Sequence, residues 1–158
     1  MSTLVQLRQF LIAANKAGYA SGKESQWKKE KDKSTTISFS LGDWYTHDNF
    51  FGGEPYGGRF VVFHKERPYW IMVYYGYIKE NVSDINEVYK ILREALKLMP
   101  KNLPLRGPKI FKLQKFTYKN KWEGTLSSYS GKEEILSNGK KVYQANYMGG
   151  LVDQREGV

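Results

Sequence analysis

The chain has 158 residues, no cysteine, and a formal net charge of +9 from 25 lysines and arginines against 16 aspartates and glutamates. This composition excludes disulfides, thiolate nucleophiles and cysteine-based zinc sites, and the length suits a single domain over 1–158 with a frayed tail at 153–158. The apolar runs are too short to span a bilayer and no signal peptide is evident, so we expect a cytoplasmic protein with no membrane partner.

Residues 3–17 are predicted to form an amphipathic helix, because apolar side chains recur at helical spacing from Leu4 to Ala14. Ser2 or Thr3 can cap its start, and Gly18 is placed to end it. The polar stretch 21–34 is expected to be a solvated loop or the tip of a hairpin.

From residue 35 the apolar period changes to two, which predicts strands over 35–41 and 43–51. Two further strands, 59–64 and 69–78, are joined by four residues, Lys65 to Pro68, a length typical of hairpins. Residues 84–99 then form the second amphipathic helix, with Ser83-Asp84 as its cap and Pro100 after its end.

Strands return over 110–119, 123–129, 132–137 and 141–148, and Asn138-Gly139 predicts a type I′ turn between the last two. Helices that are segregated from runs of hairpin-linked strands are typical of the α+β class. We therefore predict an α+β fold in which two helices pack against one strongly bent antiparallel sheet, with a half-barrel as one form of it.

Residues 42–58 form the most unusual segment of the sequence. Gly52, Gly53, Gly57 and Gly58 stand close together, which predicts a backbone that side chains would obstruct. Aromatic residues gather in the same region, both in this segment and in the strand over 69–78. The spacing of Gly53 and Gly58 matches a phosphate-binding loop, but Arg59-Phe60 follow where that motif needs lysine and then serine or threonine.

Several short motifs spread over nearly the whole chain suggest a family. They are Gly42-Asp43-Trp44, Asp48, Gly52-Gly53, Pro55-Tyr56, Gly58, Tyr74-Tyr75-Gly76, Arg106-Gly107-Pro108 and Tyr147-Met148-Gly149-Gly150-Leu151. In these the chain resembles a small bacterial and archaeal domain of unknown function that occurs alone or attached to helix-turn-helix DNA-binding domains. The resemblance implies no activity, and at most a sensing or effector-binding role. The chain has Arg59-Phe60 where the family pattern leads us to expect an acidic residue.

The first functional hypothesis is a non-enzymatic small-ligand-binding or sensing domain with an aromatic-lined pocket. Carboxylates and aromatic rings beside a glycine-shaped loop are the usual components of a concave ligand site. The residues expected to bind the ligand are Asp43, Trp44, His47, Asp48, Glu54, Tyr56, Tyr74 and Tyr75. With only two histidines and no cysteine, we expect no metal site, and no motif indicates a cofactor.

The second hypothesis is nucleic-acid binding through the basic segment 101–121, which contains no acidic residue. The lysines expected to contact phosphates are Lys109, Lys112, Lys115, Lys119 and Lys121. Strand alternation mixes these lysines with apolar side chains, so an edge strand that lysines protect from self-pairing is the competing interpretation.

The third hypothesis is an enzyme of unassigned reaction that uses Asp43 or Asp48 as acid or base, because an aromatic surrounding raises the pKa of a carboxyl group. In the competing interpretation these aspartates accept main-chain hydrogen bonds and hold the loop. No catalytic signature or oligomeric state can be predicted from the sequence.

Overall fold

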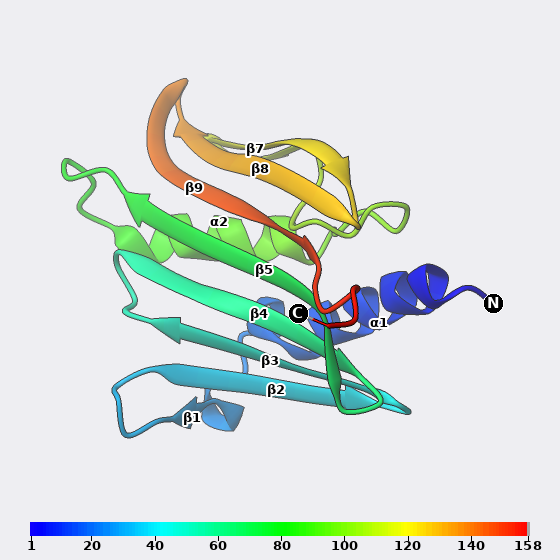
Figure 1. Ribbon diagram of the computed structural model, residues 1–158. Coiled ribbons are helices and arrows are strands. Elements are labelled where there is room, and N and C mark those ends of the chain that lie inside the picture. The colour runs from blue at the N-terminus through cyan, green and yellow to red at the C-terminus, as the bar shows by residue number, and fades with distance from the viewer. Residues whose placement is uncertain (158) are drawn as a thin grey trace.

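The computed structural model describes residues 1–157, which form two α-helices, two short 3-10 helices and nine strands (Figure 1). The helices are α1 (Thr3–Ala17), η1 (Tyr19–Ser21), η2 (Glu24–Gln26) and α2 (Ile85–Leu96). The strands are β1 (Lys28–Lys29), β2 (Thr35–Leu41), β3 (Trp44–Phe51), β4 (Tyr56–His64), β5 (Arg67–Ile78), β6 (Ile110–Leu113), β7 (Phe116–Thr125), β8 (Ser128–Ser137) and β9 (Lys140–Leu151).

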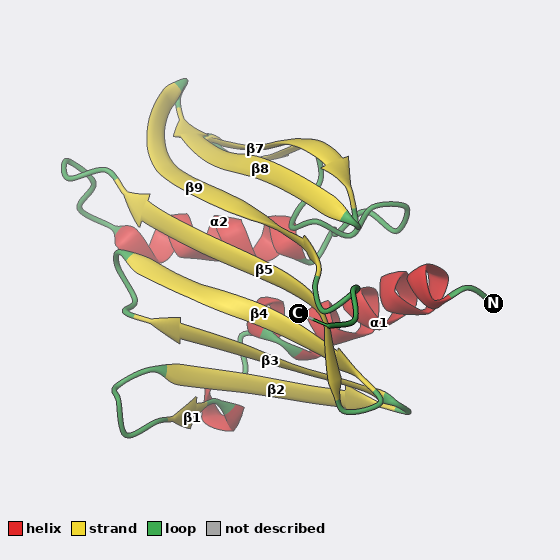
Figure 2. Ribbon diagram, viewed as in Figure 1, coloured by secondary structure: helices red, strands yellow, loops and turns green. Residues whose placement is uncertain are grey.

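All these strands pair antiparallel in one sheet, in the order β1-β2-β3-β4-β5-β9-β8-β7-β6. The sheet has two edges, β1 and β6, and is not closed into a barrel. Its order reverses after β5, because the chain crosses through α2 to the far edge and returns by hairpins to pair β9 with β5. Figure 2 shows the helices gathered apart from the strands, which confirms the predicted α+β class.

The two α-helices begin at the caps that the sequence indicates. The Ser2 hydroxyl accepts a hydrogen bond from the Val5 amide at 3.3 Å, and an Asp84 carboxylate oxygen accepts one from the Glu87 amide at 3.1 Å. Helix α1 has the predicted bounds, whereas α2 ends at Leu96 rather than at Met99.

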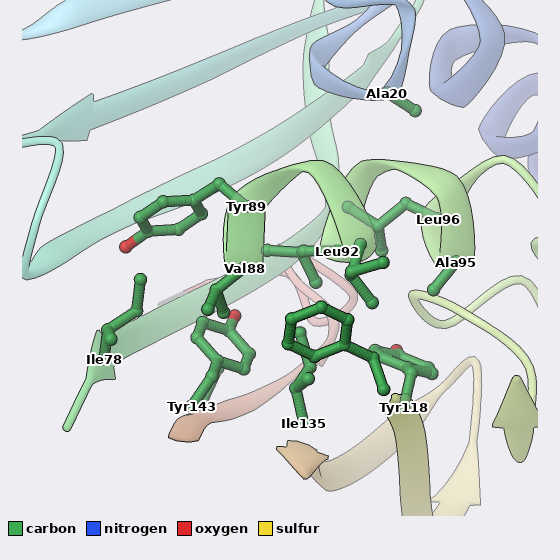
Figure 3. Packing of buried hydrophobic residues seen from close by; sticks show 13 residues of the cluster. Ala20, Ile78, Val88, Tyr89, Leu92, Ala95, Leu96, Tyr118, Ile135 and Tyr143 are labelled. Atoms are coloured by element: carbon green, nitrogen blue, oxygen red, sulfur yellow. The ribbon is translucent and has the colours of Figure 1, made fainter. Parts of the chain in front are cut away.

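Both α-helices cover the same face of the sheet, which we call the inner face. Tyr143 and Ala145 pack in the cluster that contains α2, and Tyr147 packs in the cluster that contains α1. Alternate residues of one strand point to one face, so these three β9 side chains place both helices on that face. Figure 1 shows the same arrangement, and Figure 3 shows the α2 side chains packed against strand residues such as Tyr143 and Tyr118. The opposite, outer face carries exposed side chains such as Tyr75 and Met148.

Several predicted boundaries are wrong, because turns and strand ends lie a few residues from their expected positions. The connection between β4 and β5 is the two residues Lys65-Glu66, both with positive φ, rather than four residues. The predicted strand 110–119 is broken at Gln114-Lys115, a turn without glycine, and residues 116–125 form one continuous strand. The predicted glycine loop 52–58 is also shorter, because β4 begins at Tyr56. The Asn138-Gly139 turn is confirmed, with φ of 48° and 81°.

Candidate functional site

The centre of the inner face carries a carboxylate held by a tyrosine from a different strand. Asp48 on β3 accepts a hydrogen bond from the Tyr74 hydroxyl on β5. Strand β4 lies between them, and its residue opposite Tyr74 is Gly58. Because Gly58 has no side chain, the Tyr74 ring can extend across β4 and its hydroxyl can reach Asp48.

A second tyrosine crosses a glycine in the same way. Tyr56 on β4 lies opposite Gly76 on β5, where an added Cβ would stand 2.6 Å from the Tyr56 hydroxyl oxygen. The hydroxyl continues across β5 and shares a hydrogen bond with the hydroxyl of Tyr143 on β9. Pairs of tyrosine and glycine on neighbouring strands therefore bring phenol groups together at the centre of the inner face.

Arg106, in the connection between α2 and β6, supplies the positive charge of this cluster. Its Nε and Nη2 donate to the same carboxylate oxygen of Glu133 at 2.9 Å and 2.7 Å, and the Tyr118 hydroxyl donates to the other oxygen. The Arg106 Nη2 also lies 3.5 Å from the Tyr56 hydroxyl, and its guanidinium carbon lies 5.8 Å from the centre of the Tyr74 ring. Burial alone would lower the pKa of Arg106, but the adjacent Glu133 carboxylate holds this pKa well above its usual value.

Glu54 anchors the short loop 52–55 to the rest of the site. One carboxylate oxygen accepts from the Ile78 amide at 2.7 Å, and the other accepts from the Tyr89 hydroxyl of α2. Both oxygens are thus engaged within the protein, so Glu54 positions the loop and α2 rather than presenting a carboxylate to a ligand.

A cleft of about 460 Å³ opens between the inner face, α2 and the 19–29 segment. Six aromatic and six charged side chains line it: Tyr19, Trp27, Phe50, Tyr56, Tyr74 and Tyr89, and Glu24, Lys29, Asp48, Glu54, Arg93 and Arg106, with Asp48 at its floor. A smaller, mainly apolar cavity of about 80 Å³ adjoins it toward α1 and shares Tyr19, Asp48, Tyr74 and Arg106. Asp48 and Arg106 therefore stand where the two spaces meet.

Burial alters the protonation of the groups at this floor. It raises the pKa of Asp48 to about 6, against the opposing effects of the Tyr74 hydrogen bond and the Arg106 charge. Burial also raises the pKa of Tyr56 to about 12, and that of Tyr74 well above its usual value. Asp48 can therefore exchange a proton near neutral pH, while the phenols stay protonated and available as donors.

The mouth of the cleft carries a stacked pair of rings and a cation. The Tyr19 and Trp27 rings stack with their centres 5.8 Å apart, and the Arg93 guanidinium carbon lies 5.4 Å from the Tyr19 ring centre. An Arg93 Nη lies 3.6 Å from a Glu24 carboxylate oxygen, and its buried Nε has no hydrogen-bond partner among residues 1–157. The mouth thus offers a flat apolar surface beside hydrogen-bond donors.

Four of the eight residues predicted to bind a ligand line the cleft together: Asp48, Glu54, Tyr56 and Tyr74. The structure places the other four elsewhere. Asp43 is exposed in the β2–β3 turn, and Trp44 is buried against α1 with its ring 4.2 Å from the centre of the His64 ring. His47 lies on the outer face beside Phe63, and Tyr75 is exposed on the same outer face.

The sequence reasoning missed Tyr19, Trp27, Tyr89, Arg93 and Arg106, which complete the cleft. Trp27 lies in the stretch 21–34 interpreted as a solvated loop or hairpin tip, Tyr89 and Arg93 lie on the second predicted helix, and Tyr19 lies just after the first one. Arg106 had a signal, since it stands in the Arg106-Gly107-Pro108 motif between predicted elements, and it has a positive φ of 66°. A cation at a conformationally restricted loop position is a better site candidate than a lysine on a strand.

The five lysines of the nucleic-acid hypothesis do not share one surface. Strand alternation places Lys112, Lys119 and Lys121 on the outer face of β6 and β7. Lys109 lies 5.9 Å from the Trp122 ring centre, and the Lys115 Nζ lies 3.6 Å from a Glu87 carboxylate oxygen of α2.

Within residues 1–157, no three His, Asp or Glu side chains stand close enough together to hold a metal ion. No helix in that part of the chain combines the length and the apolar character needed to cross a membrane.

A comparison with protein families gives one match. The model described as "Domain of unknown function (DUF5680)" matches residues 48–152, from within β3 to just beyond the end of β9. No curated protein matches the chain. No solved structure matches it. Asp48, Tyr74, Arg106 and Glu133 lie inside the matched segment, while Tyr19 and Trp27 at the mouth lie outside it.

Proposed function

Because the chain belongs to the domain-of-unknown-function family DUF5680, whose description assigns no activity, we propose its function from the site: it binds a small planar ligand in the cleft between the inner face and α2. The single observation that carries this proposal is the cleft of about 460 Å³, which has a carboxylate and a guanidinium at an otherwise aromatic floor. A concave, mostly apolar site with a few convergent polar groups is the usual form of a small-molecule site.

The groups at the floor restrict the chemistry of the ligand. One oxygen of Asp48 is engaged by Tyr74, which leaves the other to accept from a ligand N–H or O–H. Arg106 uses Nε and Nη2 on protein partners, which leaves Nη1 to donate to a ligand acceptor. The aromatic walls favour a flat ring by stacking. These features together suit a nitrogen heterocycle that carries both a donor and an acceptor on its edge.

A second candidate function rests on Asp48 alone. A carboxyl group with a pKa of about 6 in a cleft can act as a general acid or base near neutral pH. This is the part of the enzyme hypothesis that the geometry favours, since Asp43 is exposed in a turn outside the cleft. Apart from the tyrosine hydroxyls, the nucleophilic side chains that line the cleft and the adjoining cavity, Lys29, Ser38 and Thr46, are each hydrogen-bonded to another residue of the protein, so binding remains the primary proposal.

The test is a titration of isotope-labelled protein with planar heterocycles, with 2-aminopurine as the first probe because stacking quenches its fluorescence. We expect amide shifts that cluster at Asp48, Glu54 and Tyr89, together with quenching. The substitution Asp48→Asn should weaken binding about tenfold or more, since a hydrogen bond to a charged group contributes about 1.5–3 kcal/mol.

Asp43→Asn is the matched control, because it makes the same chemical change on an exposed turn outside the cleft. We expect it to bind like the wild type. Shifts that avoid the cleft, or equal affinities for wild type and Asp48→Asn, would refute the proposed site.

A further inference from the structure

The outer face of the sheet is the largest part of the fold that the proposed function does not use. Both α-helices pack on the inner face, so among residues 1–157 no helix covers the outer one (Figure 1). Its exposed side chains include large apolar ones on β5 and β9: Tyr75 is 56% exposed and Met148 is 58% exposed. Sheet faces of this kind are open to a partner.

A groove of about 830 Å³ runs over this face across β5, β9, β8 and β7. Strand register orders its side chains in a row: Tyr75 on β5 is opposite Asn146 on β9, which is opposite Lys132 on β8, which is opposite Lys121 on β7. One side of the groove therefore presents an aromatic ring and the other presents lysines, and neighbouring strands are about 4.8 Å apart.

The charge of the lysine side is positive and incompletely neutralised. Outward positions on β6 to β9 carry five lysines, at 112, 119, 121, 132 and 141, and two glutamates, Glu123 and Glu134. Glu134 is already shared by Lys132 at 3.1 Å and Lys141 at 2.7 Å. Lys121 stands directly opposite Lys132, and because Glu134 is divided between Lys132 and Lys141, this like-charge pair favours a further anion nearby.

The aromatic side of the groove offers rings to stack upon. The Tyr75 and Tyr77 rings lie side by side on β5, with their centres 6.2 Å apart, and the Lys79 Nζ lies 5.3 Å from the Tyr77 ring centre. Both residues point outward, because Tyr74 before them and the buried Ile78 after them point inward, and Tyr75 is the one of the two that lines the groove.

We propose that this groove binds single-stranded nucleic acid, with bases stacked on Tyr75 and phosphates on Lys119, Lys121 and Lys132. A positively charged groove beside exposed aromatic rings is the general design for such ligands. A second copy of the chain is a poor occupant, because it would bring the same positive face and the same +9 net charge. A duplex is also a poor occupant, because its paired bases cannot reach rings that lie on a sheet.

The probe is a fluorescein-labelled oligothymidylate of about 12 nucleotides. Its binding is measured by fluorescence anisotropy at several salt concentrations between about 50 and 200 mM. Three phosphate contacts predict that log K falls with log[salt] with a slope of about −2. The double variant Lys119→Gln/Lys121→Gln should reduce that slope by about 1.4, and Tyr75→Ala should weaken binding about fivefold or more with little change in slope.

Lys90→Gln is the matched control, because Lys90 is an exposed lysine of α2 and α2 packs on the inner face. We expect it to alter affinity far less than the Lys119/Lys121 variant. Asp48→Asn should leave oligonucleotide binding intact, which separates a failure here from a failure of the proposed cleft.

Four results would overturn the proposal. The first is no binding of the oligonucleotide at the lowest salt concentration, and the second is an equal loss of affinity in Lys90→Gln and in Lys119→Gln/Lys121→Gln. The third is a duplex of the same sequence that competes for the protein as effectively as the single strand. The fourth is binding to phosphatidylserine vesicles in place of the oligonucleotide. The variants at Lys119, Lys121, Lys90 and Tyr75 change exposed side chains, so a thermal melt that matches the wild type would show that each of these folds.

Discussion

Asp48 is a carboxyl group whose ionisation is opposed by its position in the folded protein. Burial raises its pKa from 3.8 to about 6. Between these pH values the folded chain binds a proton at this site that the unfolded chain does not bind, so stability falls as pH rises through this window. Above about pH 6 the buried negative charge costs the folded state about 3 kcal/mol, since one pKa unit corresponds to about 1.4 kcal/mol.

We therefore predict that Asp48→Asn stabilises the protein, and more so as pH rises. The free energy of unfolding of the variant should exceed that of the wild type by about 2.4 kcal/mol more at pH about 7 than at pH about 4, where the unfolded carboxyl group is already partly ionised. Urea denaturation at both pH values measures this difference. Asp43→Asn, on the exposed turn, should stay within about 0.5 kcal/mol of the wild type at both.

A constant difference between wild type and Asp48→Asn at the two pH values would show that the carboxyl group is not strained by burial. The predicted cost also bears on function, because a protein retains a destabilising charge most readily where a ligand uses it. A ligand that donates an N–H to Asp48 would stabilise the ionised form and offset this cost.

At the scale of the element, the pairing of β3 with β4 depends on a glycine. A Cβ added at Gly58 would lie 2.5 Å from the Asn49 carbonyl oxygen and 2.6 Å from the Phe50 Cβ. The first of these neighbours is backbone of the paired strand and cannot rotate away, so a side chain there would push β3 and β4 apart.

We predict that Gly58→Ala destabilises the fold by about 1–3 kcal/mol, the usual cost of overpacking, and also weakens binding in the cleft, because Tyr74 crosses the sheet at this glycine. Thermal and urea denaturation measure the first effect, and 2-aminopurine titration measures the second. Gly53→Ala is the control in the same glycine-rich segment, since its added Cβ has nothing within 4 Å. Equal stability of the two variants would contradict this account.

The different roles of these two glycines show what the sequence could and could not predict at this scale. The run of glycines at 52, 53, 57 and 58 was expected as a whole to form a backbone that side chains would obstruct. An added Cβ would meet the Pro55 carbonyl at Gly52 and the β3 backbone at Gly58, but open space at Gly53. Composition identified the segment, whereas the obstruction depends on which strand passes beside each glycine.

For the whole molecule, local patterns predicted the class and most elements, because helix period, strand alternation and caps act over a few residues. The bounds of α1, and the turn at Asn138-Gly139, follow from such signals. The hairpin turn at Lys65-Glu66 was predicted two residues too long and the turn at Gln114-Lys115 was missed, because residues other than glycine or asparagine occupy positive φ there.

The candidate site was predicted only in part for a related reason. Asp48, Tyr56 and Tyr74 lie close together in sequence on adjoining strands, so their association on the inner face follows from alternation. Arg106, Glu133 and Tyr19 join them through contacts between distant parts of the chain, which a single sequence without an alignment does not reveal. Trp44 was assigned to the pocket because it lies in the aromatic-rich segment 42–58, although it packs in the cluster that contains α1.

Strand β6 forms one of the two edges of the sheet and carries a lysine. Strand β6 pairs only with β7, so its other side presents unpaired backbone groups, and its Ile110 and Leu113 are 55% and 37% exposed. Lys112 is the only charged residue of this strand. A lysine on an edge strand hinders pairing with a second copy, since that would place charges close together.

We therefore expect Lys112→Val to associate, because an uninterrupted apolar edge strand would remain. Light scattering coupled to size-exclusion chromatography should show a mass that rises with protein concentration beyond that of the wild type. The matched control is Lys119→Val on β7. Lys119 lies on the same outer face as Lys112, but β7 is paired with a strand on each of its two sides. If Lys119→Val associates as strongly, loss of charge rather than the exposed edge causes the association, and Lys112 has no protective role.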